Sequence, residues 1–245
     1  MKQLFSIRAA TENDVDSLVE LERESWTESM RHPFDQMMER IKTQIPKIFV
    51  LEMDKQVVGS ICAQRIQDVE SIRNTCWKNE DSLYDIHGQI LQLLRVNTFL
   101  LSKPKITDGV AVGAILRDFC LAYAKHSNFK QVCAVTKTTD YHEDLAQDYA
   151  SYVESRDERG QSPDSGLNFH VGKGAEVLAV LPSWRPEDRL NQGHGVLIAY
   201  TLEDSLVVRP ISWMKKNAFP PISKFSCCTH LNFLFQAGKQ NRKLH

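Results

Sequence analysis

The 245-residue sequence lacks any long hydrophobic run. A membrane-spanning helix needs about 20 predominantly apolar residues, and no window approaches even 18. The opening segment, MKQLFSIRAA, also lacks the apolar stretch of a secretory signal peptide. We therefore expect a globular, cytoplasmic protein that carries no targeting segment and does not span a membrane.

The chain also has little net charge, because 30 Lys and Arg residues stand against 31 Asp and Glu residues. Proteins that bind nucleic acid or anionic membranes through their overall field carry a clear basic excess, which is missing here. Apolar residues make up 42% and charged residues 25% of the chain, as in ordinary globular domains. We expect partners to be recognised by local sites, with no nucleic acid or membrane among them.

The six cysteines are scattered and form no disulfide pattern. Cys133 lies within an apolar run, where a reduced and buried thiol is expected, so we expect a reducing compartment. The segment 227–230, Cys-Cys-Thr-His, contains metal-ligating residue types, but no second cluster stands at zinc-finger spacing. We expect no metal.

Hydrophobic periodicity predicts alternating strands and helices. Strands are expected at residues 4–9, 48–53, 56–66, 90–101, 131–136, 176–181 and 196–200, with Asp54-Lys55 as the turn of a hairpin. Helices are expected around 15–21, 34–41, 112–123 and 141–153. Residues 68–89 are a polar insertion and 156–165 a surface loop. We expect one domain over residues 1–205, followed at 206–245 by an extension toward a neighbouring domain.

A glycine-containing loop is expected between the buried strand at 90–101 and the helix that follows. Free backbone N–H groups and the positive end of a helix dipole attract phosphate, and small residues let the backbone approach it closely. The candidate cofactor-binding residues are Gly109, Val110, Ala111, Val112, Gly113 and Ala114. On this feature alone, a plain helix N-terminus with small packing residues remains an alternative.

Three segments resemble the GNAT superfamily of acyltransferases: IRAATENDVDSLVELE, IFVLEMDKQVVGSI and the loop just described. The resemblance covers about residues 4–200. It implies an α+β fold with a central mixed, mostly antiparallel sheet, splayed middle strands and flanking helices, and a coenzyme A thioester as substrate. The superfamily's loop pattern, Gln/Arg-x-x-Gly-x-Gly/Ala, aligns with Asp108, Ala111 and Gly113. An acidic residue beside a pyrophosphate is repulsive, which counts against ordinary acetyl-CoA chemistry.

A narrower resemblance is to the GNAT-like domains of polyketide synthase loading modules. The matching residues are Thr136 at the end of QVCAVT, His170 in GLNFHVGKG and Arg185 in PSWRPED. Those domains decarboxylate malonyl thioesters, with or without passing the acetyl group to a carrier protein. The resemblance thus implies malonyl-CoA or malonyl-carrier protein as substrate, acetyl-CoA as a product, and an acyl carrier protein and neighbouring synthase domains as partners.

The chemistry of decarboxylation gives these residue types a reason of their own. Loss of CO2 leaves an enolate, whose oxygen needs hydrogen-bond donors. We assign Thr136 to orienting the malonyl group, and His170 to stabilising the enolate and supplying a proton with a pKa near neutrality. Arg185 would grip a carboxylate or a phosphate, and Trp184 would line the acyl pocket.

Each residue also has a structural alternative. Thr136 can simply end a strand, His170 can be an exposed or hydrogen-bonded loop residue, Arg185 can pair with Glu187 or Asp188, and Trp184 can anchor the core. A Cys133–His170 nucleophile pair is disfavoured because Cys133 and Thr136 point to opposite faces of a strand. Two other functions stay open: an N-acetyltransferase that uses acetyl-CoA and an amine, and a non-catalytic module that binds coenzyme A or carrier protein.

Overall fold

The computed structural model describes residues 5–99, 111–142, 145 and 147–202. Within them lie the strands β1 (Phe5–Ala9), β2 (Lys47–Met53), β3 (Gln56–Ile66), β4 (Ile90–Thr98), β5 (Gln131–Thr136), β6 (Ala175–Leu181) and β7 (Gly195–Thr201). The helices are α1 (Val15–Ser25), α2 (Phe34–Thr43), α3 (Val112–His126), α4 (Tyr149–Glu154) and α5 (Ser165–Val171). The predicted strands and the first three predicted helices are all present.

Local sequence signals explain several element boundaries. The backbone N–H of Thr11 donates to the Asp14 carboxylate at 2.8 Å, which closes a capping box just before α1. Asp54 and Lys55 both have positive φ, 50° and 67°, so they form the tight turn of the predicted hairpin. Helix α2 ends at Thr43, and the next residue, Gln44, adopts the left-handed conformation of a helix cap.

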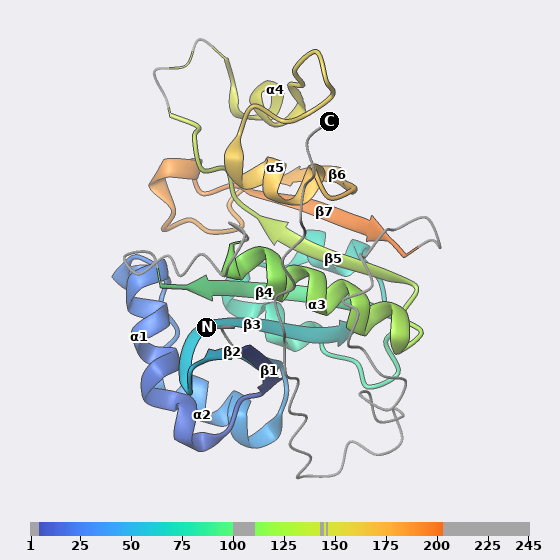
Figure 1. Ribbon diagram of the computed structural model, residues 1–245. Coiled ribbons are helices and arrows are strands. Elements are labelled where there is room, and N and C mark those ends of the chain that lie inside the picture. Colours follow the sequence, from blue (N-terminus) through green and yellow to red (C-terminus); the bar gives the residue numbers. More distant parts are fainter. Residues whose placement is uncertain (1–4, 100–110, 143–144, 146, 203–245) are drawn as a thin grey trace, which may run out of the picture.

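The strands form one mixed sheet in the order β1-β2-β3-β4-β5-β7-β6 (Figure 1). Among the strands of the described residues, only β4 and β5 pair in parallel, and their pairing covers four positions, from Ile90 opposite Gln131 to Leu93 opposite Ala134. Strand β4 continues to Thr98 beyond the last pair, so the two strands separate at this end. The predicted fold, with splayed middle strands, is confirmed.

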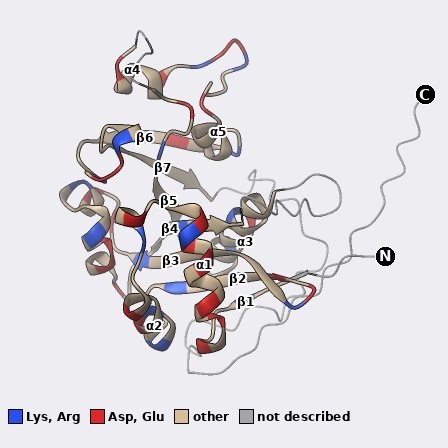
Figure 2. Ribbon diagram, turned by 90° about the vertical axis from the view of Figure 1, so that its left-hand side faces the viewer, with Lys and Arg blue, Asp and Glu red and all other residues tan. Residues whose placement is uncertain are grey.

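Helices cover both faces of the sheet. Val132 and Ala134 of β5 pack in one hydrophobic cluster with residues of α3, α4 and α5, and we call this side the α3 face. Cys133 and Val135 pack on the other side, with Trp77 and other residues of the segment between β3 and β4. Helices α1 and α2 cover the remainder of that side, which we call the α1 face. Helix α1 carries four acidic residues and one arginine, whereas α2 carries two residues of each charge (Figure 2).

Some local predictions were wrong. Among the described residues of the helix expected at 141–153, only those of α4 are helical. The segment predicted as a polar insertion at 68–89 contains two short 3-10 segments, Glu70–Asn74 and Trp77–Leu83. His170 lies in α5 and not in a loop, because the buried Asp164 carboxylate caps this helix by accepting from the Leu167 N–H at 2.8 Å.

Several predicted features lie outside the described residues: Asp108, Gly109, Val110, the Cys-Cys-Thr-His segment and the extension at 206–245. The part of the chain that the structure describes contains no helix long and apolar enough to cross a membrane. It also contains no group of three or more metal-ligating side chains.

Candidate functional site

Strands β4 and β5 stop pairing beyond Leu93 and Ala134, and we call the place where they separate the β4–β5 opening. Thr136 is the last residue of β5 and lies on the α3 face, two positions beyond Ala134. Its side chain is half-buried. The Thr136 hydroxyl contacts only its neighbour's carbonyl, Lys137 O, at 3.5 Å, which is at the limit of a hydrogen bond. This donor is therefore nearly uncommitted within the described residues.

His170 lies on the same face of the sheet, carried by α5. Its side chain is buried, and its Nδ1 atom lies 2.6 Å from the Tyr200 hydroxyl oxygen on β7. Burial, together with the nearby Arg117 guanidinium, lowers the pKa of His170 to about 3. The expectation of a pKa near neutrality was wrong, and His170 is an uncharged imidazole at pH 7. With Nδ1 bonded to Tyr200, Nε2 is the ring nitrogen left to meet a ligand.

Arg117 of α3 stabilises the end of α5 that carries His170. Its guanidinium donates to the Phe169 carbonyl and forms an ion pair with Asp118 at 2.8 Å. Neither Arg117 nor Tyr200 was predicted from the sequence as a site residue. The available signals were an arginine on the apolar face of a helix and a tyrosine at the end of an apolar strand.

Arg185 lies across the opening from His170, on the α1 face. It is buried, and its guanidinium donates to the carbonyl oxygens of Val135 at 2.7 Å and Thr136 at 3.4 Å. Glu187 instead accepts from the Trp77 indole at 3.0 Å, and Asp188 accepts from the Asn191 amide at 3.1 Å. The surface ion pair considered for Arg185 is thus wrong, and its charge is fixed against the end of β5.

Trp184 and Cys133 both lie in the core of the α1 face. Trp184 is 1% exposed, and an added Cβ on Gly195 would come within 2.9 Å of its ring. Burial raises the pKa of the Cys133 thiol, which points away from the face that carries His170. The structure therefore does not bring Cys133 and His170 together.

The N-terminus of α3 begins at the predicted phosphate-binding loop. Ala111 is the N-cap residue, and its side chain makes no capping bond. The first turn contains no acidic residue, and an added Cβ on Gly113 would find its nearest neighbour 3.6 Å away. The Ala114 N–H donates to the Ala111 carbonyl at 3.0 Å, so Val112 and Gly113 carry the N–H groups of the first turn that have no partner within the described residues of the helix.

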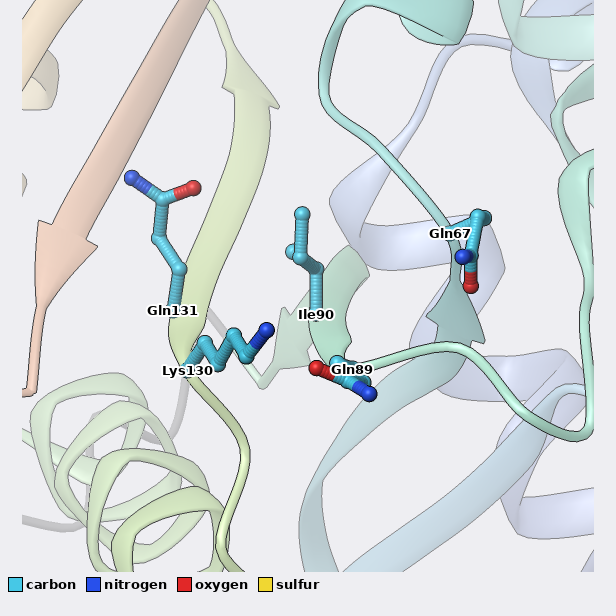
Figure 3. Close-up of a pocket in the computed structure, with 5 residues that line it drawn as sticks. All are labelled: Gln67, Gln89, Ile90, Lys130 and Gln131. Carbon is cyan, nitrogen blue, oxygen red and sulfur yellow. The ribbon is translucent and has the colours of Figure 1, made fainter.

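A surface cavity of about 320 Å³ lies at the other end of the β4–β5 pair. Polar side chains and Ile90 line it, as Figure 3 shows: Gln67, Gln89, Ile90, Lys130 and Gln131. It opens where the strands are still paired, away from Thr136. We assign it no part in the site.

Neither the family models nor the curated proteins provide a match to this sequence. Among solved structures, the loading GNATL domain of CurA from Lyngbya majuscula is 30% identical, with a TM-score of 0.73 over 81% of this chain and 98% of that one. The GphF GNAT-like decarboxylase, in complex with isobutyryl-CoA, is 30% identical, with a TM-score of 0.71 over 80% and 99%.

A malonyl-CoA decarboxylase from Rhodopseudomonas palustris shares the fold at 12% identity, with a TM-score of 0.56. That similarity covers 82% of this chain and 57% of the decarboxylase.

Proposed function

The chain belongs to the GNAT superfamily. We propose that it decarboxylates a malonyl thioester to the acetyl thioester and CO2. The substrate is malonyl-CoA or malonyl-carrier protein. The observation that carries the proposal is the buried, uncharged His170, held by Tyr200 on the same side of the β4–β5 opening as Thr136. A GNAT-like decarboxylase, GphF, is among the similar structures.

The coenzyme A arm binds at the N-terminus of α3. The uncapped first turn supports this assignment because its N–H groups can donate to phosphate oxygens. The GphF structure, solved with isobutyryl-CoA, supports a coenzyme A thioester as the ligand. We assign the phosphate contacts to residues 109–114, and the acyl end of the thioester to the opening between β4 and β5.

Decarboxylation moves the electron pair of the broken carbon–carbon bond into the thioester carbonyl, which becomes an enolate. An uncharged imidazole with its proton on Nε2 donates a hydrogen bond to this oxygen, and the Thr136 hydroxyl orients the malonyl group. The α-carbon then takes up a proton and the acetyl thioester is complete. Because the pKa of His170 is about 3, its role is hydrogen-bond donation, and water supplies the proton.

The product is an acetyl starter unit for polyketide synthesis. We propose an acyl carrier protein and neighbouring synthase domains as partners, with S-acetyl transfer to the carrier's thiol as a second step. The 30% identity to a loading domain supports this context. Arg185 grips the acyl carboxylate from the α1 face, and Trp184 packs in the core of that face next to it.

A second candidate, an N-acetyltransferase, is favoured by one observation. Burial raises the pKa of Glu80 on the α1 face to about 7, which suits a general base for an amine. However, Glu80 is only 4% exposed, so an incoming amine would have to displace the segment that covers it.

Incubation with malonyl-CoA and no acceptor tests the proposal. We expect acetyl-CoA to form, as detected by mass spectrometry, whereas an N-acetyltransferase would instead consume acetyl-CoA when an amine is added. His170→Ala and Thr136→Val should each slow malonyl conversion by about 10²- to 10⁴-fold. His87→Ala, at an exposed histidine in the segment between β3 and β4, is the control. Unchanged rates in the first two variants would contradict the site assignment.

A further inference from the structure

Three cationic side chains surround the indole ring of Trp26, on the α1 face beside the β4–β5 opening. The charge centres lie 4.3 Å from the ring centroid for Arg95, 5.0 Å for Lys137 and 5.9 Å for Arg185. The Trp26 indole N–H donates to Asn97 Oδ1 at 2.7 Å, which fixes the ring against β4. Positive charge is therefore concentrated where an acyl group would emerge between the strands.

The three cations differ in how their charges are balanced. Arg95 forms an ion pair with Glu22 at 2.8 Å and also donates to a backbone carbonyl. Within the described residues, the hydrogen bonds of Arg185 go to the carbonyls of Val135 and Thr136, and it forms no ion pair. The Lys137 ammonium lies over the Trp26 ring. No carboxylate of the described residues lies within ion-pair distance of it.

Neither Lys137 nor Arg185 is in ion-pair contact with a carboxylate of the described residues. Asp188, which also accepts from Asn191, attracts both cations from beyond ion-pair distance, and burial keeps the pKa of Glu80 at about 7 despite the arginines nearby. Burial lowers the pKa of both Lys137 and Arg185, which shows the cost of holding these charges away from water. An anion entering this space would relieve that cost.

Lys137 connects the two faces of the sheet at the end of β5. Lys137 directly follows Thr136, which lies on the α3 face, while its ammonium stacks on a ring of the α1 face. A thioester carbonyl held by His170 and Thr136 on the first face would direct its acyl chain through the opening, toward Lys137. The acyl chain of malonyl ends in a carboxylate, which would pair with the Lys137 ammonium.

We propose that Lys137, with Arg185, binds the free carboxylate of the acyl group and makes the site select dicarboxylic acyl thioesters over neutral ones. This inference rests on the proposed function for the thioester itself, and it adds a specificity-determining residue. The carboxylate contact exists only before CO2 leaves, so it favours substrate binding and not the transition state. Loss of Lys137 should therefore raise KM without lowering kcat.

The test compares binding of malonyl-CoA and acetyl-CoA by isothermal titration calorimetry, in a His170→Ala background so that malonyl-CoA is not consumed. We expect Lys137→Met to weaken malonyl-CoA binding about 10- to 100-fold, while acetyl-CoA binding changes by less than about threefold. Lys137→Arg should retain most of the preference. Lys130→Met, at an exposed lysine just before β5, is the matched control.

The outcomes separate this inference from the proposed function. If His170→Ala does not prefer malonyl-CoA, or if Lys137→Met weakens both ligands equally or neither, the carboxylate site is wrong. Steady-state assays of Lys137→Met in a chain that retains His170 add a second check. A lower kcat at unchanged KM would also overturn the carboxylate site. Conversely, a chain that prefers malonyl-CoA through Lys137 but releases no CO2 would retain the carboxylate site and refute decarboxylation.

Discussion

The hydroxyl oxygen of Tyr200 lies 2.6 Å from Nδ1 of His170, and both side chains are buried beneath α5. A phenol is the better donor and an imidazole nitrogen the better acceptor, so Tyr200 donates and the histidine proton lies on Nε2. Burial raises the pKa of Tyr200, which keeps that donor protonated. The pair therefore holds His170 as an uncharged Nε2–H donor.

Tyr200→Phe removes this donor without removing the ring. We expect kcat for malonyl-CoA to fall about 10- to 100-fold with little change in KM, because a lost hydrogen bond to a buried group costs roughly 1–3 kcal/mol. Nitrogen-15 NMR of labelled histidine should show only the Nε2–H form of His170 in the native protein and both tautomers in the variant. A variant with native tautomer and native rate would show that Tyr200 merely fills space.

Glu80 should make folding stability depend on pH. Its pKa rises from an ordinary 4.5 to about 7 in the folded chain, mainly through burial and against the attraction of Arg185, Arg95 and Arg40. The resulting stabilisation is full below the unfolded pKa and is lost as pH rises through the folded one. Between pH 5 and 8, we expect the free energy of unfolding to fall by on the order of 1–3 kcal/mol through this group.

Glu80→Gln should remove this slope, and urea unfolding at several pH values measures it. His32 and His170 have pKa values lowered to about 4 and about 3, so their contribution is lost as pH falls and has the opposite sign. Because both proteins share these histidines, the difference between native and variant curves isolates Glu80. Parallel curves would mean that Glu80 keeps its ordinary pKa.

A pair of glycine substitutions separates phosphate binding from packing at α3. An added Cβ on Gly113 has its nearest neighbour at 3.6 Å, so Gly113→Ala should leave stability unchanged or raise it by about 0.5–1 kcal/mol. If the backbone here approaches the phosphates of coenzyme A, binding of acetyl-CoA should still weaken several-fold. Unaltered binding would leave Gly113 as an ordinary helix residue.

Gly59→Ala is the contrasting change. Its added Cβ would lie 2.6 Å from Val112 Cγ1 and 3.1 Å from the Asn97 carbonyl oxygen. Chemical denaturation should show a loss of about 1–3 kcal/mol, since overpacking forces α3 away from β3.

The sheet could be predicted from sequence because its signals are local. Strand β5 was predicted at its observed bounds, since QVCAVT is a short apolar run between polar segments. Helix α5 was missed because its seven residues are too few to show helical periodicity and its sequence contains glycine and asparagine.

The candidate site was predicted in its residue types and not in its contacts. The Tyr200 hydroxyl that fixes His170 is 30 residues away in sequence, and the carbonyls that hold Arg185 are 49 and 50 residues away. Only the folded sheet brings them together. The low pKa of His170 likewise results from burial and from Arg117 on another helix, so its sequence neighbours gave no sign of it.

Arg40 joins α2 to the segment between β3 and β4, and its removal should loosen the α1 face. Its guanidinium donates to both Asp81 carboxylate oxygens, at 2.7 Å and 3.0 Å, and it is 3% exposed. Arg40→Met leaves Asp81 without its partner, although Asp81 keeps partial access to water. We expect thermal and urea unfolding to show a loss of about 1–3 kcal/mol in the free energy of unfolding, less than for a fully buried pair.

Arg23→Met is the control, because the exposed Arg23–Glu20 pair should contribute less than about 0.5 kcal/mol. Equal losses in both variants would mean that the bidentate contact does not fasten this segment to α2.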